Sequence, residues 1–305
     1  MTNEIIIIGA NSFAARTILP HLLEQYDKVH LVCRNKHDFD IHSKIQVHVT
    51  DNLASASIKN ALHNCKFGIY LASATTPASS ATTPLVELES NLEPLLTFLE
   101  SLQNKDDFTL IYTSSGGTVY GNATTGPATE TQHFSPRSYH AAAKIAGESF
   151  VHAFSRQTGN LAIILRPSNF YGVGQPFREN FGVIRAIFEC VLKNKPVTIW
   201  GDGESQRDFI YIEDFVSACT FLLQKNHTEK VQTFNVASGE SVSINHLCNL
   251  IEKVTGRKLE KIYNPMRQVD VRTVKLDSSK LQELGWAPET SIEHGLKLMW
   301  DWIKK

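Results

Sequence analysis

The chain has 305 residues, 42% of them hydrophobic, and its 30 basic and 31 acidic side chains leave a formal net charge of −1. This length allows one large or two fused domains, and without a basic surplus nucleic acid is not an expected partner. No apolar run approaches the about 20 residues that span a bilayer, no signal-peptide pattern opens the chain, and five widely spaced cysteines without a CxxC pair predict free thiols in a cytoplasmic protein with neither a disulfide framework nor a metal site.

Short apolar runs alternate with amphipathic stretches through the first half of the chain. The runs predict buried strands at 5–8, 29–33, 45–49, 67–71, 110–113 and 161–165. The stretches predict helices near 13–25, 53–63, 85–103 and 140–156. Pro84 and Pro94 predict where the third of these helices starts and bends. Strand–helix alternation predicts an α/β fold built on a Rossmann-type, doubly wound parallel sheet with helices on both faces.

After Arg166-Pro167 the pattern loosens into turns, with helices predicted near 182–194, 244–257 and 291–304. We therefore expect a Rossmann domain at 1–167 and a smaller α/β substrate lobe at 168–305, some of whose segments return to the first domain. No flexible linker separates the two parts, so a cleft between them is expected.

The first predicted strand leads into the turn Gly9-Ala-Asn-Ser12-Phe-Ala-Ala15. A tight turn here aims the backbone N–H groups of a helix N-terminus at a pyrophosphate. Gly9 supplies the first turn residue, and Ser12 and Ala15 are small residues where such turns usually carry glycine. Placed between the first strand and the first helix, the turn predicts a nicotinamide dinucleotide site. An ordinary strand-to-helix turn is the alternative.

The end of the second strand bears on the choice between NAD and NADP. An acid that grips the adenosine ribose normally stands there, but this chain has Cys33 followed by Arg34. A guanidinium can pair with a 2′-phosphate, so Arg34 favours NADP over NAD, unless it is only a solvated charge. Asp51, after the third strand, is placed to meet the adenine amino group or simply to form a turn.

Two longer segments carry a family resemblance: Tyr112-Thr-Ser-Ser-Gly-Gly-Thr-Val-Tyr-Gly121 and Trp200-Gly-Asp-Gly-Glu-Ser-Gln-Arg-Asp208. With them the chain resembles the extended short-chain dehydrogenase/reductases, specifically the NAD-dependent epimerase/dehydratase family, over about residues 4–303. The resemblance implies a nucleotide-sugar 4-epimerase, most simply for a UDP-sugar, that works by transient oxidation. A tyrosinate takes a proton from a sugar hydroxyl while hydride passes to the nicotinamide, and a lysine one helical turn on lowers the tyrosine pKa and holds the nicotinamide ribose.

The chain departs from this family at the catalytic tyrosine. The family has Tyr-x-x-x-Lys, whereas here five positions separate Tyr139 from Lys144. On a helix this leaves the two side chains about 140° apart instead of about 40°. One turn before Lys144 stands His140. Three hypotheses remain open: Tyr139 reaches the site through a non-helical entry or a π-bulge, His140 acts as the base, or catalysis is weakened or lost.

The resemblance implies further site residues. Ser115 is the expected sugar-positioning hydroxyl, with Thr118 as its substitute, because Gly116 stands where 4-epimerases commonly carry a serine. The implied cofactor contacts, besides the turn, are Asn11, Phe13, Leu71, Ala72, Asn91 and Lys144. The implied nucleotide-sugar contacts are Asn169, Arg207, Arg267 and Asp270, in which two guanidiniums can neutralise a diphosphate through forked hydrogen bonds.

Two other functions fit the same sequence. An NADP-dependent nucleotide-sugar reductase or dehydratase is favoured by Arg34, although the Asp-Glu pair that a dehydratase needs is missing. A cofactor-binding protein without turnover is favoured by the displaced tyrosine.

A homodimer is the expected assembly. The resemblance implies that the helices near 85–103 and 140–156 pair with their copies. The apolar stripe Leu92, Leu95, Leu96 and Leu99 fits such an interface or the protein's own core.

Overall fold

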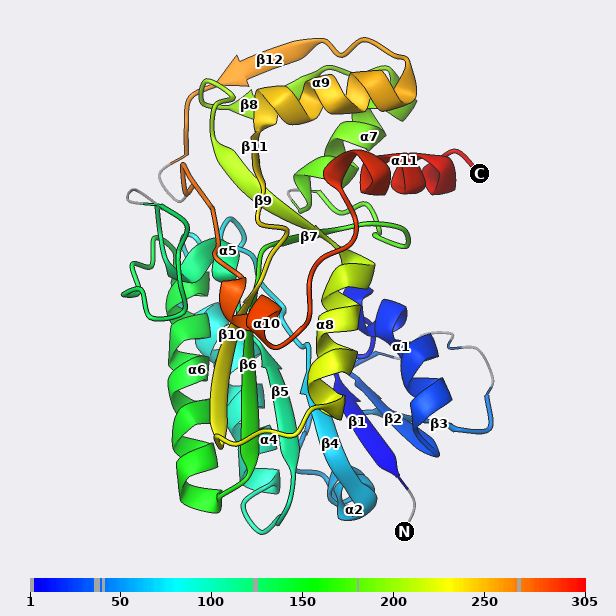
Figure 1. The fold of residues 1–305 in the computed structure, drawn as a ribbon, viewed down its shortest axis with the longest axis vertical. Helices are drawn as coiled ribbons and strands as arrows, with labels where there is room; N and C mark the ends of the chain where they lie inside the picture. The colour runs from blue at the N-terminus through cyan, green and yellow to red at the C-terminus, as the bar shows by residue number, and fades with distance from the viewer. Residues whose placement is uncertain (1–2, 36–38, 40–41, 123–125, 180, 268–269) are drawn as a thin grey trace.

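The computed structural model describes residues 3–35, 39, 42–122, 126–179, 181–267 and 270–305. Over these residues the chain forms a large lobe around a seven-stranded sheet and a small lobe above it (Figure 1). The large sheet has the order β10-β6-β5-β4-β1-β2-β3, and all of its neighbours pair in parallel. The last six strands of this order are those of a doubly wound, Rossmann-type sheet, so the predicted fold class is confirmed.

Six of the seven strands were predicted from their apolar runs. In order along the chain the seven are β1 (Glu4–Ile8), β2 (Lys28–Cys33), β3 (Ile45–Val49), β4 (Cys65–Tyr70), β5 (Thr109–Thr113), β6 (Leu161–Pro167) and β10 (Val231–Val236). Every residue of β1 is buried, as expected for a central strand that is covered on both faces. The seventh strand, β10, was not identified from the sequence, and it extends the sheet beside β6.

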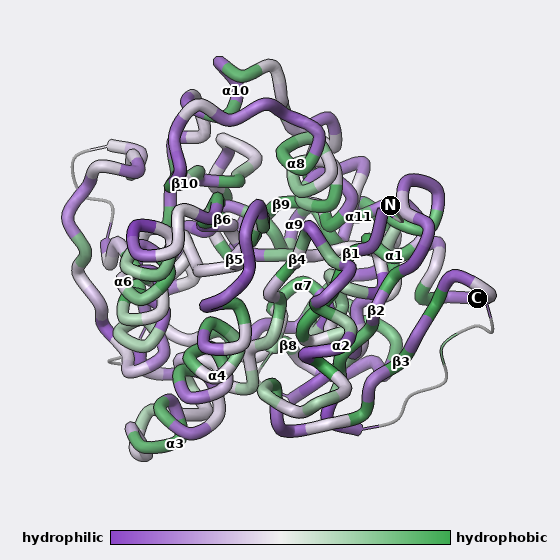
Figure 2. The backbone as a smooth tube through the Cα atoms, turned by 90° about the horizontal axis from the view of Figure 1, so that it is seen from below, coloured by the Kyte–Doolittle hydropathy of each residue, from purple (hydrophilic) through white to green (hydrophobic). Residues whose placement is uncertain are grey.

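Helices cover both faces of this sheet. The helices α1 (Phe13–Gln25) and α8 (Ile212–Gln224) share one hydrophobic core with one face. The helices α2 (Ala56–Asn64), α4 (Glu93–Ser101) and α6 (Tyr139–Thr158) share a second core with the other face. Figure 2 shows the result, with hydrophobic segments concentrated on the packed helices and strands and hydrophilic segments on the outer connections.

The predicted helix at 85–103 is divided into three. Pro84 caps α3 (Leu85–Glu87), a π-helical turn η1 (Leu88–Leu92) follows, and α4 continues to Ser101. The sequence predicted a bend at Pro94, and the structure has a wide turn ending just before it, where the Glu93 amide donates to the Leu88 carbonyl five residues back. Such turns often occur at functional sites.

The small lobe has its own core. Its sheets join β7 (Asn169–Tyr171), β9 (Gln206–Tyr211) and β11 (Ser241–Ser243), and β8 (Val197–Trp200) with β12 (Lys261–Asn264); its helices are α7 (Val183–Lys193), α9 (Ile244–Thr255) and α11 (Ile292–Ile303). Phe188 stacks on Trp300 at the centre of this core, with 5.6 Å between the ring centroids. Because α8 and β10 return to the large lobe, the chain crosses between the lobes more than once, and the boundary at residue 167 stays a prediction. Two short helices, α5 (Gly116–Val119) and α10 (Ser279–Glu283), complete the fold.

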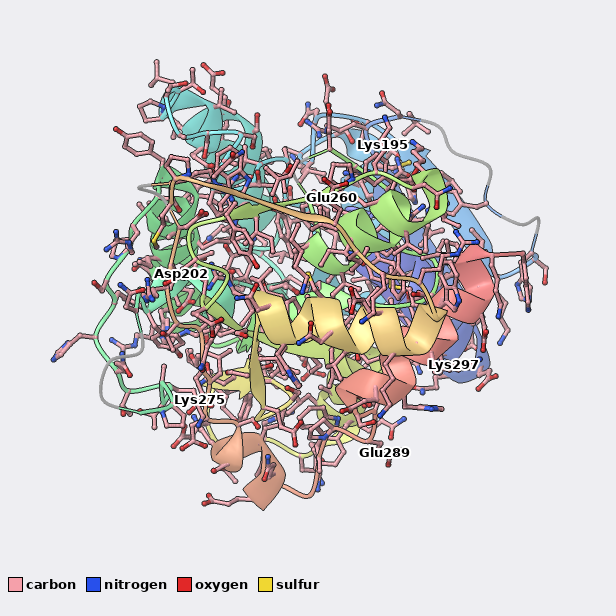
Figure 3. All side chains as sticks on the ribbon, turned by 90° about the horizontal axis from the view of Figure 1, so that it is seen from above. Lys195, Asp202, Glu260, Lys275, Glu289 and Lys297 are labelled. Carbon is pink, nitrogen blue, oxygen red and sulfur yellow. The ribbon has the colours of Figure 1, made fainter. Side chains whose placement is uncertain are left out.

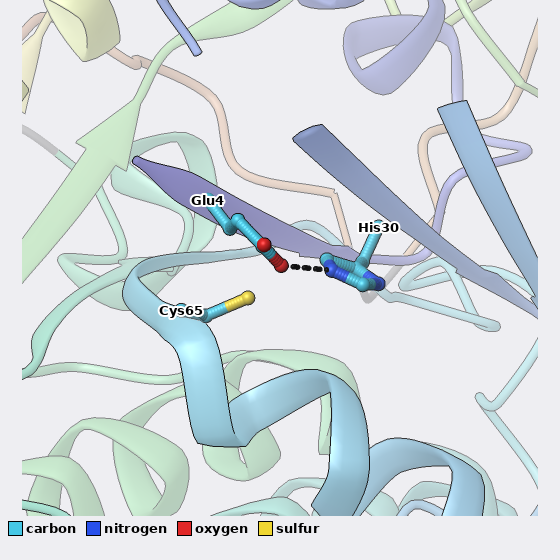
Figure 4. Close-up of side chains that lie close together, drawn as sticks. All are labelled: Glu4, His30 and Cys65. Carbon is cyan, nitrogen blue, oxygen red and sulfur yellow. Dashed lines mark hydrogen bonds and ion pairs between the residues drawn. The ribbon is translucent and has the colours of Figure 1, made fainter. Parts of the chain in front are cut away.

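A buried polar cluster lies near the amino ends of β1 and β4. His30 Nε2 is 2.8 Å from Glu4 Oε2, His30 Nδ1 is 2.9 Å from His48 Nε2, and His48 Nδ1 is 2.7 Å from Ser57 Oγ. Glu4, His30 and Cys65 bring their potential metal-ligand atoms within 4.8 Å of one another (Figure 4). These hydrogen bonds engage all four imidazole nitrogens of His30 and His48, so the side chains of this cluster satisfy one another's hydrogen bonds.

Two smaller expectations can be compared with the described residues. None of their helices is both long enough and apolar enough to cross a bilayer. All five cysteines carry free thiols, as their spacing predicted.

Candidate active site

The turn after β1 is built around Gly9. Its φ of +90° is a backbone conformation that side-chain-bearing residues rarely adopt, and a Cβ added there would lie 2.6 Å from the Ala72 nitrogen. The amides of Gly9 and Ala10 both donate to the Val32 carbonyl. Gly9 therefore lets β1 and the chain after β4 approach closely, next to Leu71 and Ala72, which the sequence had assigned to the cofactor.

Ser12 caps the N-terminus of α1. Its hydroxyl accepts a hydrogen bond from the Ala15 amide at 3.2 Å, which fixes the entry into the helix. The first turn of a helix carries amides without intrahelical partners, and here they stand beside small side chains. Phe13 is half-buried at N1, and Asn11 donates to the Asn35 carbonyl at 3.0 Å while its Oδ1 is buried without a partner. A helix N-terminus at a glycine turn fits a diphosphate.

Lys144 lies buried at the carboxyl edge of the sheet. Its Nζ donates to the Thr113 carbonyl at the end of β5, at 3.0 Å. Burial lowers the pKa of Lys144 to about 8, and the negative charges of Glu87 and Glu148 oppose that lowering. The ammonium is therefore a fixed positive charge at this edge at neutral pH.

His140, one turn earlier on α6, is buried beside Lys144, whereas Tyr139 is 47% exposed. His140 Nδ1 lies 3.0 Å from Thr75 Oγ1 and 3.8 Å from Glu87 Oε1. Burial lowers the pKa of His140 to about 4; Lys144 adds to the lowering and Glu87 opposes it. The imidazole is thus neutral at pH 7, and the same lowering of its pKa makes it a weaker proton acceptor than an exposed histidine. Helix α6 is regular from Tyr139 onward, after the Ser138 N-cap.

Asn91, on η1, forms hydrogen bonds that connect the neighbouring polar groups. Its Nδ2 donates to Glu87 Oε2 at 2.6 Å and to Thr75 Oγ1 at 2.7 Å, and its Oδ1 accepts from the Ala74 amide at 2.8 Å. A small cavity is lined by Glu87, Asn91, His140 and Lys144 together with Tyr70, Ala72 and Tyr112. The predicted residues Ala72, Asn91, His140 and Lys144 therefore meet in one place.

The hydroxyl candidates follow β5. Ser115 is partly buried at the N-cap of α5, without a side-chain capping bond, and Thr118 Oγ1 lies 3.5 Å from the Ser115 carbonyl. Gly116 stands where a serine was expected by resemblance, and the packing explains why. A Cβ there would lie 2.5 Å from Leu276 Cδ1 and 2.7 Å from the Arg166 carbonyl oxygen.

The two residues proposed for the adenosine end are both exposed. Arg34 follows β2, and its charge lowers the pKa of the buried Tyr70, against the larger effect of burial. Asp51 lies in a bend after β3. Their positions at the carboxyl ends of β2 and β3 leave both open to a ligand.

The residues predicted for the nucleotide sugar lie in and next to the small lobe. Arg267 makes two 2.9 Å bonds to Asp270 and lies over the Trp200 ring, at 5.2 Å from its centroid. Burial lowers the pKa of Arg207, Asp270 raises it and Arg267 lowers it, so the three charges interact. Asn169 donates to the Asp208 carbonyl at 2.9 Å.

The loop between β8 and β9 is anchored close to these residues. Asp202, on this loop, bonds Arg272 at 2.8 Å, and Arg207 donates to the Arg272 carbonyl at 3.3 Å. Figure 3 looks onto the small-lobe end, where exposed charges of both signs are spread out, including Asp202, Lys195 and Glu260.

Two polar residues of the site were missed by sequence reasoning. Glu87 had a usable signal, because it precedes Asn91 by four residues and therefore shares a helix face with it. Thr75 had none, because it follows β4 in an irregular segment whose course the sequence does not fix.

Comparisons with known proteins show which proteins this chain is similar to. Residues 5–237 match the model of the "NAD dependent epimerase/dehydratase family". A UDP-glucose 4-epimerase of Mycolicibacterium smegmatis is 27% identical over 301 residues, covering 95% of each chain. A dTDP-4-dehydro-6-deoxyglucose reductase of Escherichia coli is 30% identical over 235 residues, covering 77% of this chain and 73% of its own. The solved UDP-glucose 4-epimerase of Thermotoga maritima with UDP-glucose superposes with a TM-score of 0.90 at 28% identity, covering 99% of this chain and 98% of its own.

The family match spans more than half of the chain and includes the glycine turn, the strand β5 motif and Lys144. The family's description names NAD, which lends no support to the preference for NADP drawn from Arg34. The chain belongs to the NAD-dependent epimerase/dehydratase family.

Proposed function

We propose that this protein is an NAD-dependent nucleotide-sugar 4-epimerase, with a UDP-sugar as substrate, in which His140 takes the role of the usual tyrosine base. One observation carries the proposal. The neutral imidazole of His140 is buried next to Lys144, while the ring of Tyr139 is 47% exposed. A base must be unprotonated and close to the reacting hydroxyl at working pH, and His140 meets the first condition.

The proposed cofactor fits the residues around the first turn. Gly9 allows the close backbone approach, the N-terminus of α1 offers amides to a diphosphate, and Lys144 stands ready to hold the nicotinamide ribose. When bound, the nicotinamide supplies a reversible acceptor for hydride. Because of Arg34, NADP is the alternative cofactor. Titration with both dinucleotides should give the lower Kd for NAD, and tighter binding of NADP would overturn this assignment.

The chain's own residues would move one proton out and back. His140 Nε2 accepts the proton of the sugar 4-hydroxyl and later returns it, while burial, with a smaller effect of the Lys144 charge, keeps the pKa of the resting imidazole low and the ring neutral. Ser115 is the proposed donor that orients the sugar oxygen. Because both proton and hydride return to the sugar, the reaction consumes no cofactor.

The nucleotide diphosphate is proposed to lie against Arg207 and Arg267, with Asn169 at its inner end. Support comes from the interacting charges of Arg207, Arg267 and Asp270 and from the bidentate geometry of guanidinium groups. Neutralising Arg207 by Arg207→Gln should raise KM without a matching fall in kcat, because it removes ground-state binding.

We also propose that the protein is a homodimer through η1, α4 and α6. Leu95 and Leu99 turn into the protein's own core, but Leu88 and Phe150 are 49% and 44% exposed. The double variant Leu88→Asp with Phe150→Asp should be monomeric by light scattering, and a monomeric unmodified protein would contradict this proposal.

The deciding experiment incubates purified protein with UDP-glucose or UDP-N-acetylglucosamine and catalytic NAD, and follows the 4-epimer by NMR. Tyr139→Phe should retain activity and His140→Ala should lose it. Retained dinucleotide binding without conversion of any nucleotide sugar tested would overturn the proposal in favour of a binding protein without turnover.

A reductase is the second candidate, favoured by the 30% identical reductase among the relatives and by Arg34. It predicts stoichiometric loss of NADPH absorbance with a 4-keto sugar nucleotide. An epimerase would show no such loss.

A further inference from the structure

Glu87 is a buried carboxylate that the reaction above does not use. Its side chain is 5% exposed, and its Oε2 accepts the 2.6 Å bond from Asn91. Its Oε1 has no hydrogen-bond partner and lies 3.8 Å from His140 Nδ1. A buried charge is costly unless something nearby stabilises it, so the placement of Oε1 beside the imidazole calls for a role.

The hydrogen bonds around Asn91 fix the direction of the others. Because Asn91 Oδ1 accepts from the Ala74 amide, its Nδ2 must donate, and the two hydrogens of Nδ2 go to Glu87 Oε2 and Thr75 Oγ1. Thr75 Oγ1 is therefore an acceptor toward Asn91, and toward His140 it can use either its second lone pair or its own hydroxyl hydrogen.

Thr75 can accept from Nδ1 or donate to it, so Glu87 Oε1, which as a carboxylate oxygen can only accept, is the group that distinguishes the two tautomers of His140. A hydrogen on Nδ1 would point at two oxygens, Thr75 Oγ1 at 3.0 Å and Glu87 Oε1 at 3.8 Å. With the hydrogen on Nε2 instead, the Nδ1 lone pair would face the carboxylate. The second arrangement is electrostatically worse. Among the described residues, Nε2 has no hydrogen-bond partner.

We propose that Glu87 is a positioning residue: with Thr75 it holds His140 in the Nδ1–H tautomer, so that the bare Nε2 is the proton acceptor. The proposal deepens the function proposed above and rests on it. Two charged groups face His140, Glu87 from α3 and Lys144 from α6 itself, and the phenols of Tyr70 and Tyr112 line the same cavity. During proton transfer the carboxylate would stabilise the imidazolium that forms, as the orienting carboxylate does in a Ser-His-Asp triad.

The test uses Glu87→Gln, which keeps the shape and removes the charge, with Glu229→Gln, at an exposed carboxylate away from the site and the proposed dimer face, as the matched control. Imidazole nitrogen shifts of His140, assigned by their loss in His140→Gln, report the tautomer and the pKa without any turnover. Glu87→Gln should lower the His140 pKa further, because the negative charge that raises it is gone, and should populate the Nε2–H tautomer. Glu229→Gln should change neither.

Kinetics give the second measurement. Glu87→Gln should lower kcat by about tenfold to a hundredfold at an almost unchanged KM, and Glu87→Asp should recover part of the loss. Thr75→Val, which lacks the hydroxyl, should shift the tautomer in the same direction. It takes the place of Glu87→Gln in the test if Glu87→Gln folds poorly. An unchanged tautomer and pKa in folded Glu87→Gln would overturn the proposal. If the unmodified protein shows the Nδ1–H tautomer but epimerises no sugar, the proposed function fails while the role of Glu87 in holding the imidazole stands.

Discussion

Two buried histidines stand at opposite ends of the same parallel sheet, each beside a buried glutamate. Near the amino ends, His30 bonds Glu4 and His48, and both of its ring nitrogens are engaged. At the carboxyl end, His140 bonds Thr75 through Nδ1, and no residue in the described part of the chain hydrogen-bonds its Nε2. Glu87 likewise leaves Oε1 without a hydrogen bond. The same residue types thus form a closed structural pair at one end and an open pair at the other.

This contrast teaches how to separate a structural histidine from a chemical one. Burial alone does not distinguish them, because His30 and His140 are 3% and 7% exposed. The unpaired atoms do, since buried polar groups that lack partners persist where a ligand or a reaction uses them. Substitutions at His140 and at His30 test the two ends of the sheet separately.

The largest effect is expected from His140→Ala. Removing a general base typically costs a hundredfold to ten-thousandfold in rate, so epimerisation followed by NMR should fall by about this factor. The melting temperature should change little by comparison. A variant that stays within threefold of the unmodified rate would remove His140 from the mechanism.

The reverse pattern is expected from His30→Ala. It removes the hydrogen bonds that His30 makes with Glu4 and His48, and the loss of a hydrogen-bond partner in the interior costs about 1–3 kcal/mol. Urea unfolding should show this loss, while kcat of the remaining folded protein stays near normal. His133→Ala, at an exposed histidine, is the control and should leave both quantities unchanged.

Two glycines allow a similar comparison between a site position and a purely structural one: Gly9 in the turn after β1 and Gly159 at the end of α6. Gly9 and Gly159 have φ values of +90° and +75°, but only at Gly9 would a Cβ meet the backbone, whereas at Gly159 nothing lies within 4 Å. Gly159→Ala should lower the free energy of unfolding by about 1 kcal/mol, the cost of the left-handed conformation. Gly9→Ala should lower it further and weaken dinucleotide binding in calorimetry. Equal effects of the two changes would mean that the contact with Ala72 does not matter.

The last prediction concerns pH. The pKa of His140 is lowered to about 4 in the folded protein from an ordinary value of 6.5, so between these values the unfolded chain binds the extra proton. Stability should therefore fall as the pH drops from about 6.5 to about 4, by at most about 1.4 kcal/mol per pH unit. Urea titrations at pH 7 and pH 5 should show this slope, and it should be smaller in His140→Ala. An identical slope in the variant would assign the loss to other groups.

Sequence patterns predicted most of the strands of the large lobe. Buried strands such as Ile5–Ile8 form from residues adjacent along the chain, so their apolar pattern is visible in the sequence itself, whereas the capping role of Ser12 was seen only in the structure. The small lobe was harder to predict, because strands such as β8 and β12 are short and partly exposed and pair with each other across a long stretch of sequence. The strand β10 was missed for the same reason, since only its pairing with β6 gives it a place in the sheet.

The sequence by itself determined the family, the Rossmann-type sheet, the glycine turn and the position of Lys144, since each rests on residues adjacent along the chain. It also exposed the five-residue spacing between Tyr139 and Lys144, but it left three hypotheses open. Tertiary structure was needed to bring Thr75 and Glu87 to His140 and to turn Tyr139 outward. Burial, tautomer and charge at His140 depend on neighbours 53 and 65 positions away, and distances of that kind are set only when the helices pack on the sheet.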